Sequence, residues 1–246
     1  MDSIWMVMGL AALPAIGNFC GGLLAEFLPI PKGMLNNALH AAAGILIAVV
    51  AVELMPEALS NVSGWTVGVA FGLGGLTYLG IERLVEKIQS AQGKTANANL
   101  GMWMIYIAVA IDLFSDGLLI GTGSAVSFSL AVILALGQVL ADVPEGYATI
   151  ANMKDKGVPR SKRFLLSASF AIPVLGAAAL AYYLLRDQSE ALQMSALAFT
   201  AGLLTVAAVE DMISEAHESS EDTRWSILSF TGGFVLFTFV SAGLGS

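Results

Sequence analysis

Long apolar stretches, separated by short polar segments, repeat along most of the chain. Eight of them are long enough for a membrane-spanning helix, which needs about 20 mostly apolar residues. They cover residues 3–26, 36–59, 64–86, 101–123, 127–152, 163–185, 191–216 and 225–244. The connections carry turn residues, as in Pro29–Pro31 and Asn61–Gly64, and leave no room for a separate soluble domain. The pattern predicts an all-α integral membrane protein with a single transmembrane domain over residues 1–246.

The basic residues are distributed unevenly between the two ends of these predicted spans. Ten of them lie at the ends of spans 1, 3, 5 and 7, whereas only Arg186 lies on the opposite side. Membrane proteins keep Lys and Arg mainly in their cytoplasmic connections. We therefore expect a multi-pass protein of the plasma membrane with both termini extracellular or periplasmic. A missed span would have scrambled the bias, so the bias also supports the prediction of eight spans.

Composition agrees with a lipid environment and excludes several functions. Of the residues, 57% are hydrophobic and 12% are charged, which is too little charge to cover a soluble domain of this length. The chain has 11 Lys and Arg against 19 Asp and Glu, and no segment forms a basic stripe. We therefore expect no nucleic-acid partner. Cys20 is the single cysteine, so neither a disulfide nor a cysteine metal site is expected.

Carboxylates interrupt the apolar stretches of spans 4 and 5. Span 4 carries Asp112 and Asp116, and span 5 carries Asp142 and Glu145. Spacings of four and three residues place the acids of each pair on one helix face. No Lys or Arg lies within these spans, so the acids must be protonated or neutralised by a bound cation. Oxygen ligands from two facing helices suit a divalent metal ion.

A simpler interpretation is that protonated acids only hold the helices together through hydrogen bonds. Two facing pairs beside Pro144 and glycines favour the cation site instead. Pro144 also leaves the carbonyl of Leu140 without its helical partner, because proline has no N–H. The sequence therefore predicts a break in span 5 that exposes a backbone oxygen to an ion.

Spans 2 and 7 contain similar sequences. Ala43–Leu46, followed by Glu53 and Glu57, resembles Ala201–Leu204, followed by Asp211 and Glu215, at a constant spacing of 158 residues. By the charge bias these two spans run in opposite directions, as in transporters built from inverted repeats. We therefore expect helices 1–3 to be repeated in inverted form by helices 6–8 around a central pair, helices 4 and 5.

At these residues the sequence resembles the ZIP (Zrt/Irt-like protein) family of divalent metal transporters. The family pattern in helix 5 is His-Glu/Asp-x-Pro-Glu-Gly, which Ala141–Gly146 matches from its second residue onward. The pattern in helix 4 is approximately His-Asn-x-x-Glu/Asp-Gly, and Asp112–Gly117 aligns with it. The resemblance extends from span 2 to span 8. It implies eight helices, both termini outside the cell, and a metal site built from helices 4 and 5.

The resemblance also implies roles for individual residues. Asp116 and Glu145 would share or bridge the metal, with Asp112 and Asp142 on either side. Span 7 would add Glu210 as a further metal ligand, with Asp211 as the close competitor for that position. This chain is a divergent member, because it lacks the usual His ligands in helices 4 and 5 and replaces the Asn by Leu. A nearly all-oxygen site is harder, so zinc, manganese, iron(II), cadmium, cobalt and magnesium are all candidate ions.

The remaining acids would form a pathway on both sides of this centre. Glu53 and Glu57 lie toward the outside, and Glu215 and His217 lie toward the cytosol. Metal entry into such a path should displace protons. We expect no resident cofactor, because the metal ion is the substrate, and we expect the lipid bilayer as the other partner. The sequence leaves open how many ions the centre holds, in which direction they are transported and whether the protein forms a homodimer.

Two alternatives belong to other functional classes. One is an intramembrane metal-dependent hydrolase, in which the metal activates water. Such enzymes usually keep a His in the site, whereas His40 and His217 both lie near span ends. The other is a proton-coupled carrier of organic cations. The sequence favours a metal transporter, without enzymatic activity, over both.

Overall fold

Eight helices in the described part of the chain are long and apolar enough to cross a membrane. The computed structural model describes residues 3–91, 98–213 and 224–244. The spans are, in order, α1 (Ile4–Phe27); α2, η1 and α3 (Lys32–Ala48, Val49–Leu54, Met55–Asn61); α4 (Gly64–Ala91); α5 (Ala98–Val126); α6 (Phe128–Asp155); α7 and α8 (Arg160–Ser169, Ala171–Leu185); α9 and η2 (Glu190–Ala207, Ala208–Ile213); and α11 (Arg224–Leu244). The predicted all-α fold and its eight spans are confirmed, with ends shifted by a few residues.

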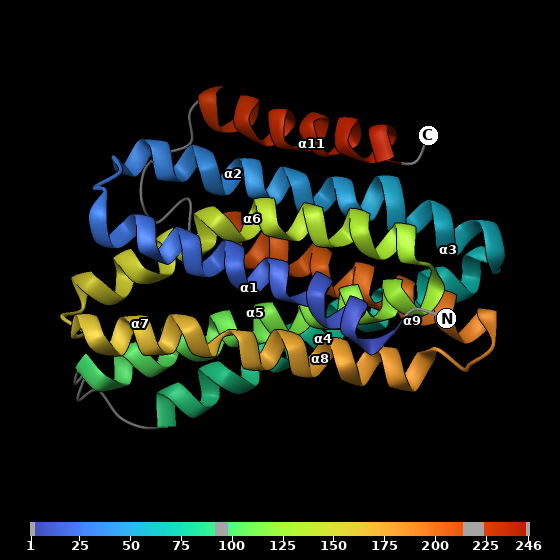
Figure 1. Ribbon diagram of the computed structural model, residues 1–246, viewed down its shortest axis with the longest axis horizontal. Helices are drawn as coiled ribbons and strands as arrows, with labels where there is room; N and C mark the ends of the chain where they lie inside the picture. Colours follow the sequence, from blue (N-terminus) through green and yellow to red (C-terminus); the bar gives the residue numbers. More distant parts are fainter. Residues whose placement is uncertain (1–2, 92–97, 214–223, 245–246) are drawn as a thin grey trace.

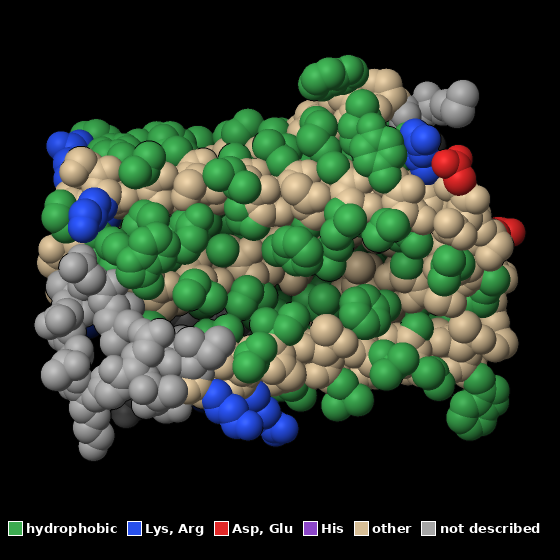
Figure 2. Space-filling view, turned by 90° about the horizontal axis from the view of Figure 1, so that it is seen from below, with side chains coloured by type: hydrophobic (Ala, Val, Ile, Leu, Met, Phe, Trp, Pro, Cys, Tyr) green, Lys and Arg blue, Asp and Glu red, His purple; other side chains and the backbone are tan. Residues whose placement is uncertain are grey.

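The helices lie side by side along the long axis of the molecule (Figure 1). Helix α1 begins, and α11 ends, at the same end of the bundle, on the right in Figure 1. The outside of the bundle is apolar: Ile172 and Phe239, for example, are 73% and 72% exposed. On the face in Figure 2, hydrophobic side chains run along the whole length, and acidic side chains are visible only near the right end. Such a surface suits a lipid environment.

Four close helix pairs build the bundle. These are α1 with α6, α5 with α8, α2 with α11, and α4 with α9. In the expected inverted repeat, spans 1, 2 and 3 correspond to spans 6, 7 and 8, and α5 corresponds to α6. Under this correspondence the pair of α1 and α6 is equivalent to the pair of α8 and α5. The pair of α2 and α11 is likewise equivalent to the pair of α9 and α4. The pairing is therefore that of the expected inverted repeat around a central α5/α6 pair.

Both repeats contain a π-helix in corresponding places, η1 in span 2 and η2 in span 7. In η1 the wide turn ends with the Met55 N–H donating to the carbonyl of Val50, directly before Pro56. Single π-turns within helices are frequent at functional sites. By contrast, α6 continues through Pro144 as one helix. The predicted break in span 5 is therefore wrong, because neighbouring helices can support a proline inside a membrane helix.

Glycines on α1 let this helix approach α6 at backbone distance. A Cβ placed on Gly21 would overlap the carbonyl of Val143, and one on Gly17 would lie 2.9 Å from the carbonyl oxygen of Val139. Small residues at such crossings are the usual means of close packing in membranes. Helix α1 is therefore pressed against the segment of α6 that carries Asp142.

The connection between α5 and α6 consists of a single residue, Ser127. Its backbone is extended, and its side-chain oxygen accepts a hydrogen bond from the N–H of Leu130 at 3.1 Å. Such a cap satisfies one of the free N–H groups at the start of α6. The turn forces α5 and α6 to run antiparallel as immediate neighbours.

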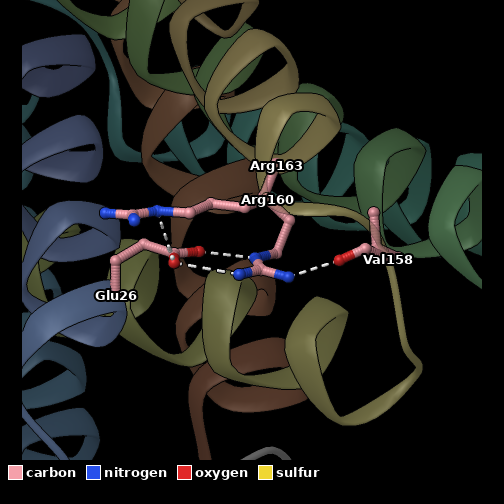
Figure 3. Close-up of polar contacts among 4 residues, drawn as sticks. All are labelled: Glu26, Val158, Arg160 and Arg163. Atoms are coloured by element: carbon pink, nitrogen blue, oxygen red, sulfur yellow. Dashed lines mark hydrogen bonds and ion pairs between the residues drawn. The ribbon is translucent and has the colours of Figure 1, made fainter.

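An ion pair joins the end of α1 to the start of α7 (Figure 3). The guanidinium of Arg163 binds both oxygens of Glu26, at 2.5 and 2.9 Å, and also donates to the carbonyl of Val158. Arg160 adds a second contact to Glu26 at 3.4 Å. The Glu26 and Arg163 side chains are 5% and 9% exposed, so the pair is buried where span 1 meets span 6.

Replacing Arg163 with Met should lower the stability of the protein by about 1.5–3 kcal/mol, because Glu26 would lose its main charged partner while staying buried. Thermal unfolding in detergent would measure the change. Arg186→Met is the matched control, since Arg186 pairs with Asp187 at an exposed position, and should stay within about 0.5 kcal/mol of the wild type. Equal effects of the two substitutions would contradict the role assigned to the buried pair.

Candidate metal centre

Helices α5 and α6 bring four acids together in the interior of the bundle. Asp112 and Asp116 come from α5, and Asp142 and Glu145 come from α6. Each of the four is at most 6% exposed. Within each helix the two acids share a face, because they are four and three residues apart. The structure thus places the predicted pairs on facing sides of two adjacent helices.

The carboxylates are close enough to share one ion. One oxygen from each of Asp112, Asp116 and Asp142 lies within 4.8 Å of the others. Glu145 is a direct neighbour of Asp112 and Asp142. Metal–oxygen bonds of about 2.0–2.6 Å place two ligands of one ion at most about 5 Å apart. The geometry therefore suits a cation bound between the two helices.

Several oxygens of this centre lack any partner. Asp116 Oδ2, Asp142 Oδ2 and Glu145 Oε2 are buried without a hydrogen bond. None of the four acids forms an ion pair with a Lys or Arg in the described residues. Burying unpaired carboxylates is costly unless a proton or a cation neutralises them. The hard oxygen donors fit divalent ions from magnesium and manganese to zinc.

Gln138 belongs to the same cluster, and the sequence analysis missed it. It lies on α6, one turn before Asp142, and is 1% exposed. Its Nε2 donates a hydrogen bond to Asp116 Oδ1, while its Oε1 is buried without a partner. Its position four residues before Asp142 was the available signal, because it places the amide on the acid-bearing face of α6.

Asn18 is a second buried amide that the sequence analysis did not single out. It lies on α1, 1% exposed, and neither side-chain polar atom has a hydrogen-bond partner. Its backbone carbonyl touches α6 at Gly146, directly after Glu145. An unpaired amide within an apolar helix needs an explanation, and its place beside the four-acid centre supplies a functional context.

The acids of span 2 lie apart from the four-acid centre. Glu53, within η1, is partly buried and accepts a hydrogen bond from Ser241 of α11. Glu57, within α3, is also partly buried. Through Ser241, Glu53 lies in the half of the bundle where α11 ends. The role of both acids in a path stays a prediction.

The acids of span 7 are placed only in part. Glu210, within η2, is exposed, so the structure does not bring it into the four-acid centre. The side chain of Asp211 and the residues Glu215 and His217 lie outside the described part of the chain. Their roles as ligand and pathway residues stay predictions. His40 lies buried on α2, with Nδ1 3.0 Å from the carbonyl oxygen of Asn36.

A cavity of about 310 Å³ opens between the α1–α2 connection and the second half of α6. Tyr147 and Ala148, two and three residues after Glu145, line it, and Lys32 and Lys154 line it at the end with the basic connections. The hydroxyl of Tyr147 donates to the carbonyl of Leu28 at 3.0 Å and so ties α6 to this connection. None of the four acids is among the residues that line it, so the cavity reaches the turn of α6 that follows Glu145 and not the four-acid centre itself.

Comparison with known proteins identifies the family of the chain. No curated protein matches the chain. The profile of the ZIP zinc transporter family matches residues 86–241, from the end of α4 to α11. The matched region includes both helices of the four-acid centre. It also covers more than half of the chain, and the protein therefore belongs to the ZIP zinc transporter family, whose members are membrane transporters and not enzymes.

Proposed function

We propose that the protein carries a divalent metal ion across the plasma membrane through the four-acid centre between α5 and α6. The observation that supports this most is the set of three buried carboxylate oxygens without hydrogen-bond partners, one each on Asp116, Asp142 and Glu145. Oxygens within 4.8 Å of one another enclose a small ion. An organic cation would need a larger space, which argues against the organic cation carrier.

The ion's route follows from the surroundings of the centre. Glu53 and Glu57 supply acids on the side where α1 begins, which we assign to the outside of the cell. The cavity beside Tyr147 provides the way to the cytosolic side. Glu210, Asp211, Glu215 and His217 would attract or release ions there. Rocking of the two repeats around α5 and α6 would expose the centre to each side in turn.

The donor set predicts a broad choice of ions. Asp112 stands where the family pattern has His, and Ala141 removes the other His. Carboxylate oxygens suit manganese and iron(II) as well as zinc, cadmium and cobalt, whereas imidazole favours the later metals. We therefore expect the preference for zinc over manganese to be weak, and we expect no resident cofactor.

Uptake of Zn²⁺, Mn²⁺, Fe²⁺, Cd²⁺ and Co²⁺ into proteoliposomes tests the proposal. The wild type should show saturable uptake of at least one of these ions. The double variant Asp116→Ala, Glu145→Ala should lose at least 90% of this uptake, because each substitution removes an oxygen donor. Even changes to residues that only hydrogen-bond to metal ligands lower metal affinity or activity by about 10–100-fold.

The matched control is Asp187→Ala, which removes an exposed acid, paired with Arg186, from the α8–α9 connection. It should transport like the wild type. Monodisperse elution in detergent shows that each variant is folded. Uptake that survives in the double variant would disprove the route through α5 and α6, and a folded wild type that moves none of the ions would disprove metal transport itself.

A further inference from the structure

We propose that Gln138 is a functional member of the metal centre, which supplies a neutral oxygen ligand from Oε1 while its Nε2 holds Asp116 in position. The inference rests on the proposed transport through α5 and α6. It extends that function by adding a ligand that is not an acid and lies outside the Asp-x-Pro-Glu-Gly segment of α6.

Gln138 is in direct contact with Asp116. Gln138 crosses from α6 to α5 and donates to Asp116 Oδ1. This bond fixes the direction of the Asp116 carboxylate and leaves its other oxygen, Oδ2, without a partner. In metal sites a ligating carboxylate usually binds the ion through one oxygen and accepts a hydrogen bond at the other.

The amide of Gln138 also has an oxygen that is available to an ion. Gln138 Oε1 is buried and has no hydrogen-bond partner. Oε1 and Nε2 of one amide are about 2.2 Å apart, given the standard bond lengths. Because Nε2 contacts Asp116, Oε1 also lies close to the Asp116 carboxylate. A single ion could therefore bind both Asp116 and Oε1, which would remove the cost of the unpaired amide oxygen.

The position and the neutral charge of Gln138 also suit a metal ligand. Gln138, Asp142 and Glu145 are spaced by four and three residues, so they form one row along α6. The four acids already balance two divalent ions, or one ion and two protons. A fifth carboxylate in this row would add charge that nothing nearby neutralises, whereas an amide adds an oxygen donor without charge. The amide also binds an ion more weakly than a carboxylate, which helps an ion to leave.

The test compares Gln138→Leu, Gln138→Met and Gln138→Glu with the wild type in equilibrium binding of Mn²⁺ and Zn²⁺ to the purified protein, and in uptake by proteoliposomes. The Leu and Met variants lose both amide functions, and each serves if the other does not fold. They should bind both ions at least tenfold more weakly and raise the KM for uptake, in the range of 10–100-fold that altered partners of metal ligands produce. Gln138→Glu keeps an oxygen and should bind within tenfold of the wild type, or more tightly, with slower release and a lower maximal rate.

The matched control is Gln193→Leu, the same chemical change on α9, where the amide donates to the carbonyl of Leu185. It should bind and transport like the wild type. Less than a tenfold loss of affinity in folded Leu or Met variants would overturn the inference, as would a loss in Gln138→Glu as large as theirs. Either result, with uptake still abolished by Asp116→Ala, Glu145→Ala, would leave the proposed function intact. A wild type without uptake would instead reject the proposed function.

Discussion

Replacing Asp116 with Asn is expected to raise the melting temperature of the metal-free protein while it removes metal binding. Without an ion, four buried carboxyl groups within one small space must either repel one another or take up protons. Asn keeps the shape of Asp and an oxygen that can accept from Gln138, but it removes one charge. Replacing buried ionic groups by uncharged residues of similar volume can stabilise a protein by about 1–4 kcal/mol, which corresponds to roughly 2–16 °C for a chain of this size.

The response to metal should have the opposite sign. An ion at 100 times its dissociation constant stabilises the folded wild type by about 2.7 kcal/mol. The Asn variant should gain little, because its carboxylate donor is gone. Asp187→Asn is the control for removing an acid, and it should leave both the metal-free melting temperature and the gain with metal unchanged. A metal-free Asn variant no more stable than the wild type, together with an undiminished gain with metal, would show that the ion binds elsewhere.

The fold was largely predictable because each membrane span satisfies its own backbone hydrogen bonds and reveals itself by local composition. The pairing of the spans was predictable only through the inverted repeat. Its sequence signal was confined to Ala43–Leu46 and Ala201–Leu204. The structure extends it to the two π-helices, η1 and η2, and to the equivalent helix pairs.

The acids of the centre were predictable for a simple reason. An ionisable residue within an apolar span is rare and costly, so each one marks a site. Gln138 and Asn18 carry no charge, and an amide within a membrane helix is common enough to pass as a packing residue. Their importance depends on which neighbours they have, and that information is not local. Only the structure shows that Gln138 Oε1 and both side-chain polar atoms of Asn18 are buried without a hydrogen bond.

The proline prediction failed for a related reason. Pro56 and Pro144 are each followed by Glu, yet a π-helix precedes Pro56 and α6 passes through Pro144 without interruption. What a proline does to a membrane helix depends on the helices around it. Helix α1 lies at backbone distance from α6 on both sides of Pro144, at Gly21 and at Gly146. We attribute the straight course of α6 to this support.

Replacing Gly146 with Ala should remove most of the transport activity, although the change adds only one methyl group. This glycine ends the Pro-Glu-Gly segment, and the structure shows what it does there. A Cβ at Gly146 would lie 2.6 Å from the carbonyl carbon of Asn18 and even closer to the carbonyl oxygen. Both are backbone atoms of α1, which cannot move aside as a side chain can. Helix α1 would therefore have to shift away from α6, at a cost above the 1–3 kcal/mol that is usual for overpacking.

The shift would act directly on the metal centre, because Gly146 follows Glu145 and α1 also touches α6 beside Asp142 through Gly17. A displacement of about 1 Å is enough to loosen a preorganised site. Gly176→Ala on α8 is the matched control, since a Cβ there meets no atom within 4 Å. It should keep wild-type uptake and melting temperature, whereas Gly146→Ala should lower both. A Gly146→Ala protein with normal uptake and stability would mean that α1 and α6 do not stay in contact during transport, and α1 could then no longer be counted as part of the wall that positions the ion.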